Sequence, residues 1–319
     1  MNSMWIPLQW SISIPWPVGR LRRNIRPMPA PMKVRGLSSV AARTLPLSTC
    51  TSLRSVAAMT RRHRTLPGVE QKEFDSDGVR VAYYLEGPAD GPPALLVHGF
   101  CSNFQVNWVG SRWVESLANA GRRVVGLDLR GHGRSGKPHD PAEYGPKMVL
   151  DVVRLLDHLG YGQSDYVGYS MGSQIGVRLL VGDARERVRR AVLGGVGINV
   201  TESWRHGEAI ARRLRGDEGE SSPAALMFYN FAVSVPGNDL EALACCITGR
   251  GEPVTEDQLR AIATPVLVAV GGADPIARDP KRLVELIPGA AYFEVPGRDH
   301  TTAVPSRAIK DRAAEFLQG

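Results

Sequence analysis

Three things that this sequence lacks narrow the range of functions open to it. Its four cysteines are Cys50, Cys101, Cys245 and Cys246. Two of them are adjacent, which disfavours a bond between them, so we expect reduced thiols and no disulfide framework. No run of 18 apolar residues occurs, so we expect no membrane-spanning helix. No His or Cys spacing suits a metal site, and we expect neither a metal nor an organic cofactor.

Acidic residues are absent from the first 69 positions, which hold eleven Lys or Arg. The rest of the chain has 28 Lys or Arg against all 32 Asp or Glu, so the net charge of +7 belongs to the N-terminal stretch. We predict that residues 1–69 form a disordered basic extension, because they are rich in Arg, Ser and Pro. The mildly acidic body gives no reason to expect a nucleic-acid partner or integral membrane association.

The extension has two main interpretations. It has the composition of a mitochondrial or chloroplast transit segment. Alternatively, Met59 is the natural start, the preceding residues are a mis-called upstream extension, and the expected location is the cytoplasm. A basic arm that contacts a membrane or a nucleic acid is a third interpretation.

From residue 70 onward, apolar strand-like runs alternate with helix-like segments, which predicts an α/β domain over residues 70–319 with a mostly parallel sheet between helices. The strands are expected at Glu73–Asp77, Val79–Glu86, Pro93–Val97, Arg123–Leu127, Ser164–Val167, Ala191–Gly194, Pro265–Val270 and Ala291–Val295. The helices are expected at Trp108–Ala120, Pro146–Leu159, Gly172–Val181, Pro280–Leu286 and Ala303–Leu317.

Residues 198–258 interrupt this alternation. They contain helix-like pieces at Glu202–Arg215, Ala224–Val233 and Asp239–Ile247, and we expect no strand among them. This pattern predicts a short helical cap inserted into the α/β domain. Its basic residues Arg205, His206, Arg212 and Arg213 are interpreted as a solvated helix face.

Residues Gly168-Tyr169-Ser170-Met171-Gly172 form the pattern G-x-S-x-G between a predicted strand and a predicted helix. A serine on such a tight turn projects its hydroxyl beyond the sheet. Glycines flank it because the turn is strained and neighbouring segments come close. The pattern therefore predicts a nucleophilic serine, with the following N–H groups forming part of an oxyanion site.

Asp274 and His300 each come just after a predicted strand, as does the segment His98-Gly99-Phe100. In a parallel sheet, active groups gather beyond the carboxyl ends of the strands. The order Ser170, Asp274, His300 is that of the serine triad in α/β hydrolases.

With these pieces and the segment Asp128-Leu129-Arg130-Gly131-His132-Gly133-Arg134-Ser135, the chain resembles the α/β-hydrolase fold superfamily, of the serine esterase, lactonase and perhydrolase type. The roles expected are His300 as base, Asp274 as the acid that orients it, and the backbone N–H groups of Phe100 and Met171 as oxyanion donors. Asp299 is the alternative orienting acid. The resemblance implies structural roles for His98, Asp128 and His132.

A serine at position 170 favours acyl chemistry, since relatives that open epoxides or displace halide use a carboxylate there. We therefore predict a serine hydrolase of the carboxylic-ester type that cleaves a small-molecule ester, thioester or lactone through an acyl-enzyme. C–C bond hydrolysis and perhydrolysis use the same triad and are alternatives, as is a non-catalytic ligand-binding protein. A small-molecule substrate is the expected partner, in a pocket formed by Phe100, Cys101, Met171, Phe228, Tyr229 and Ile276.

Overall fold

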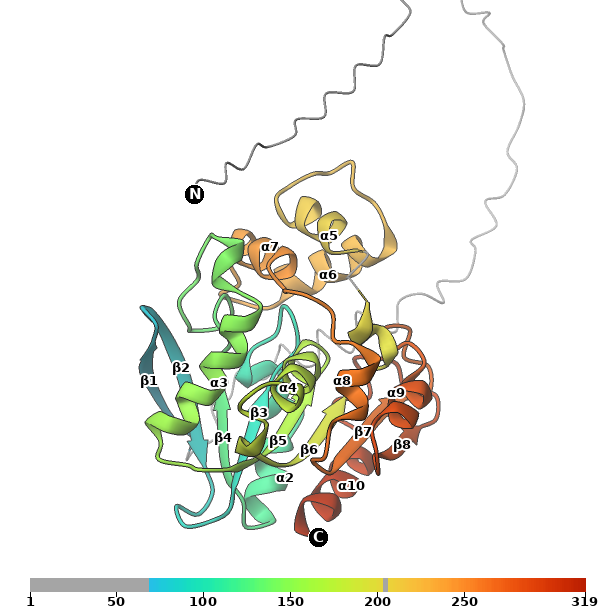
Figure 1. Ribbon diagram of the computed structural model, residues 1–319. Coiled ribbons are helices and arrows are strands. Elements are labelled where there is room, and N and C mark those ends of the chain that lie inside the picture. Colours follow the sequence, from blue (N-terminus) through green and yellow to red (C-terminus); the bar gives the residue numbers. More distant parts are fainter. Residues whose placement is uncertain (1–68, 203–205) are drawn as a thin grey trace, which may run out of the picture. The chain divides into compact units, whose positions relative to one another are not determined.

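The computed structural model describes residues 69–202 and 206–319 (Figure 1). The predicted basic extension lies outside these residues except for Val69, and so does Arg205. In the described part, eight strands form one sheet in the order β1-β2-β4-β3-β5-β6-β7-β8. The strands are β1 (Glu70–Ser76), β2 (Val79–Glu86), β3 (Pro93–Val97), β4 (Arg123–Leu127), β5 (Ser164–Tyr169), β6 (Val188–Gly194), β7 (Val266–Gly271) and β8 (Ala291–Val295).

The sheet is mostly parallel, which confirms the predicted fold class. β1 and β2 form an antiparallel hairpin, and β2 runs antiparallel to β4. All other neighbours are parallel, with Val97 of β3 beside Gly168 of β5. The chain leaves β3 toward β4 on one side and returns to β5 on the other. The carboxyl ends of β3 and β5 therefore meet where the strand order reverses, the usual place for a site in such sheets.

Alternation along the strands builds a core on each face of the sheet. In β3, Leu95 and Val97 belong to one buried cluster, while Ala94 and Leu96 belong to the other. Helices cover both clusters because burial of their apolar stripes is the main stabilising contribution. The first face packs against α3 (Pro146–His158), α4 (Met171–Val181) and α9 (Pro280–Leu286), and the second against α2 (Trp113–Asn119) and α10 (Arg307–Gln318).

Between β6 and β7 the described residues form helices and connecting loops but no strand. We call this segment the helical insertion. In Figure 1, α5, α6 and α7 lie together on one side of the sheet, and α5 contacts both of the others. Phe228 packs edge-on against Phe100, which follows β3, at 5.6 Å between ring centroids. The insertion therefore covers the carboxyl end of the sheet. It comprises η4 (Ile198–Thr201), α5 (Gly207–Leu214), α6 (Pro223–Ser234), α7 (Leu240–Thr248) and α8 (Glu256–Arg260).

Three helices differ from their predicted bounds by more than one residue. The continuous helix expected over Trp108–Ala120 is wrong, because a π-helix, η1 (Gln105–Val109), is separated from α2 by Arg112 in a left-handed conformation (φ 66°). α10 begins four residues later than expected, since Pro305 disfavours helix at the preceding residue. α5 begins at Gly207 instead of Glu202. Among the described residues, no helix is long and apolar enough to cross a membrane.

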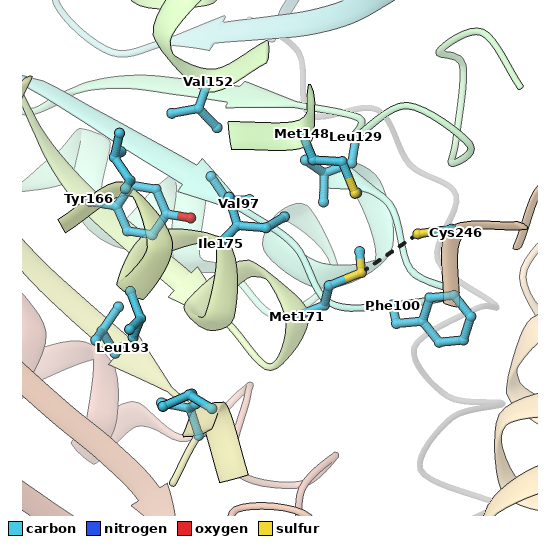
Figure 2. Packing of buried hydrophobic residues seen from close by; sticks show 14 of the residues in the cluster. Val97, Phe100, Leu129, Met148, Val152, Tyr166, Met171, Ile175, Leu193 and Cys246 are labelled. Atoms are coloured by element: carbon cyan, nitrogen blue, oxygen red, sulfur yellow. Dashed lines mark hydrogen bonds between the residues drawn. The ribbon is translucent and has the colours of Figure 1, made fainter. Parts of the chain in front are cut away.

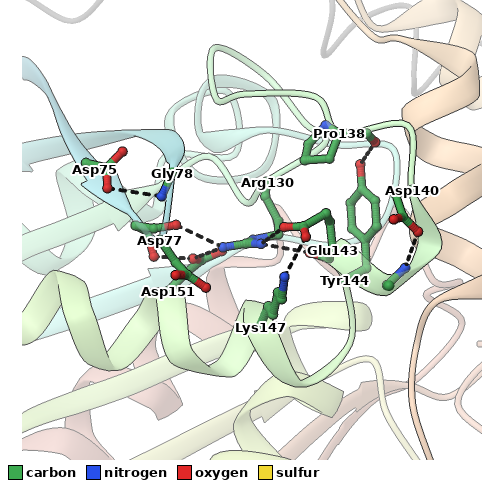
Figure 3. A network of polar contacts seen from close by, with 12 residues as sticks. Asp75, Asp77, Gly78, Arg130, Pro138, Asp140, Glu143, Tyr144, Lys147 and Asp151 are labelled. Atoms are coloured by element: carbon green, nitrogen blue, oxygen red, sulfur yellow. Dashed lines mark hydrogen bonds and ion pairs between the residues drawn. The ribbon is translucent and has the colours of Figure 1, made fainter.

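A buried polar network ties three elements beside the site (Figure 3). Arg130, which follows β4, is fully buried and donates from Nε and Nη2 to the two carboxylate oxygens of Asp151 in α3, each at 2.7 Å. Its Nη1 donates to the main-chain oxygen of Glu143 at 2.8 Å, and Nη2 to that of Ser76 at 3.2 Å. The network joins the end of β1, the loop after β4 and α3.

Candidate active site

Ser170 occupies a strained turn between β5 and α4. Its φ is 53° and its ψ is −114°, a conformation that costs a residue with a side chain about 1–3 kcal/mol. A Cβ on Gly168 would lie 2.7 Å from the carbonyl carbon of Gly172, and one on Gly172 would lie 2.0 Å from the Val97 oxygen. Both positions therefore require glycine. The turn brings Ser170, which is 7% exposed, to the carboxyl ends of β5 and β3.

His300 and Asp274 form a hydrogen-bonded pair at the ends of β8 and β7. His300 Nδ1 donates to Asp274 Oδ2 at 2.7 Å, and the Asp274 side chain is almost fully buried. Asp274 Oδ1 also accepts the N–H groups of Ile276 and Ala277, at 2.8 and 3.1 Å. A carboxylate only accepts, so Nδ1 carries the imidazole proton and Nε2 has the lone pair of a base.

The same contacts keep Asp274 ionised. Burial by itself would raise the pKa of this carboxyl group. The hydrogen bond and charge of His300, together with the two N–H groups, outweigh burial and hold the pKa below its usual value. An ionised Asp274 is the form that orients and stabilises an imidazolium.

Asp299, the alternative orienting acid, has a different set of partners. Its Oδ1 accepts the N–H and hydroxyl groups of both Thr301 and Thr302, at 2.8 to 3.0 Å. These contacts close the turn that carries His300. The geometry thus pairs the imidazole with Asp274 and gives Asp299 a role in the loop.

Tyr169 is a site residue that the sequence did not indicate. Its hydroxyl donates to the main-chain oxygen of His300 at 2.6 Å, and its ring lies 5.2 Å from the imidazole, centroid to centroid. Gly195 keeps room for both, since a Cβ there would lie 2.9 Å from His300 Cε1. Tyr169 occupies a variable position of G-x-S-x-G, so the pattern carries no signal for it.

Of the two predicted oxyanion residues, Met171 directly follows Ser170, and Phe100 lies in a turn that packs close to it. Met171 is the first residue of α4, where a helix leaves N–H groups without internal partners. The turn that contains Phe100 packs close, because a Cβ on Gly99 would lie 3.4 Å from Ser170 Cβ. Figure 2 shows the Met171 side chain pointing toward Cys246 of α7, at 3.9 Å between the sulfur atoms. The side chains of Phe100 and Met171 are thus both buried against the helical insertion.

His98 holds the turn after β3. Its Nε2 accepts the Leu129 N–H at 3.0 Å, so Nδ1 is protonated and donates to the Gly99 oxygen at 2.8 Å. Its ring is fully buried, and burial lowers its pKa to about 4. His132 is equally buried, and burial together with the neighbouring His98 lowers its pKa to about 3. Both rings are therefore neutral at pH 7.

Asp128 connects the loops around this turn. It accepts from the Tyr84 hydroxyl and from the N–H groups of Phe104 and Arg134, each at 2.8 Å. These three partners belong to β2 and to the segments that follow β3 and β4. These contacts agree with a role in holding the loop after β4.

Cys101 has the surroundings of an inert thiol. It is fully buried, and burial raises the pKa of its thiol well above the usual value, which keeps it protonated. Its main-chain oxygen accepts from Asn238 Nδ2 at 2.9 Å. The described cysteines, Cys101, Cys245 and Cys246, are all free thiols.

A cavity of about 340 Å³ is lined by residues that are close in sequence to Ser170 and Asp274, although Ser170, Asp274 and His300 do not line it themselves. Its lining residues include Gln174, one helical turn after Ser170, and Pro275 and Ile276, which directly follow Asp274. Of the six predicted pocket residues, Phe228 and Ile276 line it and the other four do not. Its wall is formed by Gln174, Arg178, Asn199, Val200, Glu202, His206, Pro223, Ala224, Met227, Phe228, Arg250, Gly251, Pro275, Ile276 and Arg278.

The cavity is also lined by charged residues, whereas the six predicted pocket residues are all uncharged. Arg178 and Arg250 line it, although no pattern in the sequence marked either residue. His206, expected on a solvated face, is exposed and lines the cavity as well. Arg212 does pair on the surface, with Asp217 and Glu220.

Comparison with known proteins agrees with this architecture. Residues 92–215 match the model of the alpha/beta hydrolase fold family. A 3-oxoadipate enol-lactonase of Acinetobacter baylyi is 27% identical over 215 residues, covering 62% of this chain and 77% of the lactonase. A haloalkane dehalogenase of Mycolicibacterium paratuberculosis is 34% identical over 122 residues, but that match spans only 38% of the dehalogenase and 37% of this chain.

Two solved structures resemble most of the chain. An N-acyl homoserine lactone degrading enzyme is 25% identical with a TM-score of 0.60, covering 78% of this chain and 99% of its own. The enol-lactonase of Burkholderia xenovorans is 23% identical with a TM-score of 0.61, covering 78% of this chain and 100% of its own. With the strand order and the family match, these likenesses show that the chain belongs to the α/β-hydrolase fold superfamily.

Proposed function

We propose that the chain is a serine hydrolase that cleaves a small-molecule carboxylic ester, thioester or lactone through an acyl-enzyme intermediate. The observation that carries the proposal is Ser170 on its strained turn, with the His300–Asp274 pair at the ends of strands in the same sheet. A hydroxyl nucleophile with a positioned base attacks acyl carbon. Direct attack on an epoxide or a haloalkane would instead call for a carboxylate at position 170.

In the first half-reaction, Ser170 Oγ attacks the carbonyl carbon while His300 Nε2 takes the hydroxyl proton. The oxygen of the tetrahedral intermediate gains a negative charge and accepts hydrogen bonds from the N–H groups of Phe100 and Met171. Loss of one such donor costs about 3 kcal/mol in comparable enzymes. When the intermediate collapses, His300 returns the proton to the leaving oxygen or sulfur, and the acyl group stays on Ser170.

In the second half-reaction, water attacks the acyl-enzyme and gives its proton to His300 Nε2. The second tetrahedral intermediate uses the same two N–H groups. It collapses to release the carboxylic acid, and the proton passes back to Ser170 Oγ. Asp274 stays ionised throughout and stabilises the imidazolium in both halves.

The proposal is tested by labelling and turnover in parallel. Protein that begins at Met59 is treated with a fluorophosphonate probe and with p-nitrophenyl esters from acetate to decanoate. We expect stoichiometric labelling and ester hydrolysis, both lost in Ser170→Ala. Ser221→Ala is the control, since Ser221 is exposed in the loop between α5 and α6. A folded Ser170→Ala protein with full activity would contradict the proposal.

The remaining outcomes separate the alternatives. Labelling without ester turnover would favour a narrower substrate, either a lactone or the C–C bond of a carbonyl compound. Peroxide-dependent oxidation in the presence of a carboxylic acid would favour perhydrolysis on the same triad. Tight ligand binding with neither labelling nor turnover would favour a non-catalytic binding protein.

A further inference from the structure

The helical insertion contacts both residues that are proposed as oxyanion donors. Phe228 of α6 packs edge-on against the Phe100 ring, at 5.6 Å between centroids. Cys246 of α7 lies against Met171, at 3.9 Å between the sulfur atoms (Figure 2). These contacts join side chains, whereas an oxyanion donor is a main-chain N–H group. A third contact, made by Asn238, reaches the main chain of the turn after β3.

Asn238 lies in the loop between α6 and α7, and its side-chain amide joins two elements. Nδ2 donates to the Cys101 main-chain oxygen at 2.9 Å, and to the Ala232 main-chain oxygen in the last turn of α6 at 3.1 Å. An amide nitrogen has two hydrogens, so each carbonyl oxygen can accept one of them. The contact with Ala232 fixes the amide to α6, and the other contact ties the turn after β3 to the insertion.

Cys101 is in a main-chain conformation that depends on such contacts. Its φ is 61°, in the left-handed region that a residue with a side chain rarely adopts. Such a conformation is unfavourable by itself and persists only where the surroundings hold it. The Asn238 hydrogen bond is one contact that holds it, and it comes from the insertion.

Two peptide groups lead from Asn238 to the Phe100 N–H. The Cys101 C=O and the Ser102 N–H belong to the first group, and the Gly99 C=O and the Phe100 N–H belong to the second. Neither group is cis, so in each of them the N–H points opposite to the C=O. The Ser102 N–H donates to the Gly99 oxygen at 3.2 Å. Asn238 therefore orients the first group through its oxygen, and the first group orients the second.

The second peptide group has one contact in the main body and one that leads to the insertion. The Gly99 oxygen accepts from His98 Nδ1 at 2.8 Å as well as from the Ser102 N–H. Hydrogen bonds in such a chain polarise one another. A donor at the Cys101 oxygen thus strengthens the Ser102 N–H as a donor, and through it the Phe100 N–H.

We infer that Asn238 is a positioning residue for the Phe100 N–H, through which the helical insertion helps to set the geometry of the oxyanion site. The inference rests on the proposed function, because that function assigns the Phe100 N–H to the oxyanion. The negative charge of the oxyanion develops only during the reaction. Loss of this positioning should therefore slow the chemical step without weakening substrate binding.

Asn238→Leu tests the inference, because leucine has a similar size and no hydrogens to donate. We expect kcat on a p-nitrophenyl ester to fall about 5- to 30-fold with KM nearly unchanged, less than the loss of about 100- to 1,000-fold when an oxyanion donor itself is removed. A trifluoromethyl ketone forms a tetrahedral adduct with a nucleophilic serine and carries the same oxyanion. Its inhibition constant should rise by about the factor by which kcat falls. A higher KM with unchanged kcat and an unchanged inhibition constant would overturn the inference.

Two further variants serve as controls. Asn230→Leu makes the same change at an exposed position of α6 and should alter neither kcat nor the inhibition constant. Asn238→Asp keeps the shape of the side chain but has no hydrogen to donate at pH 7. Its charge lies beside the N-terminus of α7, where a carboxylate is favourable, so this variant should fold. We expect it to lose at least as much kcat as Asn238→Leu, and full kcat in this variant would also overturn the inference.

Amide exchange separates this inference from the proposed function. In Ser170→Ala protein, hydrogen–deuterium exchange is followed by mass spectrometry on overlapping peptides that cover residues 99–102. We expect the Ser102 N–H to exchange roughly tenfold faster when Asn238→Leu is added. Faster exchange in a protein that shows neither labelling nor turnover would contradict only the proposed function. Unchanged exchange, or an equal increase in Asn230→Leu, would overturn the inference.

Discussion

At the scale of single residues, the proposed base His300 is positioned by more than Asp274. Asp274 fixes the imidazole of His300 through Nδ1, and the Tyr169 hydroxyl fixes the main chain of the same residue through its oxygen. Tyr169 also precedes Ser170 directly. One side chain therefore couples the turn that carries the nucleophile to the loop that carries the base.

Tyr169→Phe removes this coupling and keeps the ring. The partly buried His300 oxygen loses its donor, so we expect the free energy of unfolding to fall by about 1 kcal/mol. We expect kcat on a p-nitrophenyl ester to fall about 3- to 10-fold with KM unchanged, because the base is positioned less well for proton transfer. Unchanged kcat in a protein destabilised by that amount would show that the contact is only structural.

The three residues that sequence reasoning proposed as the triad share one property. Ser170, Asp274 and His300 each follow an apolar strand, and a strand end in a parallel sheet has a known position. Arg178 and Arg250 have no such marker, since one lies within a helix and the other in a loop 72 positions later. Only folding of the insertion brings them to one wall, so no local pattern predicts them.

At the scale of elements, the bounds of several strands and of one helix agree with the sequence prediction. β3, β4, β8 and α9 begin and end where the sequence predicted. The segment after β3 did not follow its pattern, because its path depends on the left-handed Arg112 and on the Ser111 hydroxyl, which donates to the Asn107 oxygen. Such main-chain features leave no periodicity in the sequence.

The Arg130–Asp151 pair is the strongest test of how elements hold the site loops. Both side chains are fully buried. Arg130→Met leaves the Asp151 charge buried without its partner, so we expect a loss of about 3–5 kcal/mol in the free energy of unfolding, measured by urea denaturation. The double variant Arg130→Met, Asp151→Leu should recover part of the loss.

An exposed pair on α10 provides the control for this measurement. Arg312→Met breaks the contact with Glu315, which is mostly exposed, and should cost less than about 1 kcal/mol. A comparable small effect for Arg130→Met would contradict the role given to the buried network.

At the scale of the whole molecule, the cavity is lined by residues of the main body and by residues of the helical insertion. α4 and the loop after β7 come from the main body, while α6 and the residues after α7 come from the insertion. The sequence predicted both parts separately. How they close on one another depends on side-chain packing, such as that between Phe100 and Phe228, which residue patterns do not encode.

Acid should destabilise the whole fold through His98 and His132. The pKa values of about 4 and about 3 in the folded protein lie below the ordinary value near 6.5 of an unfolded chain. Above pH 6.5 both states are neutral and these groups add no pH dependence. Below pH 6.5 only the unfolded chain takes up the two protons, so stability falls by about 1.4 kcal/mol per pH unit for each ring.

Between pH 7 and pH 5 the two rings together should remove about 4 kcal/mol of unfolding free energy, measured by urea denaturation at each pH. His132→Phe should remove about half of this loss, because it leaves one buried ring to titrate. His139→Gln should leave the loss intact, since His139 is exposed and both buried rings remain in this variant. Equal stability at the two pH values would mean that these rings are protonated, or accessible to water, in the folded protein.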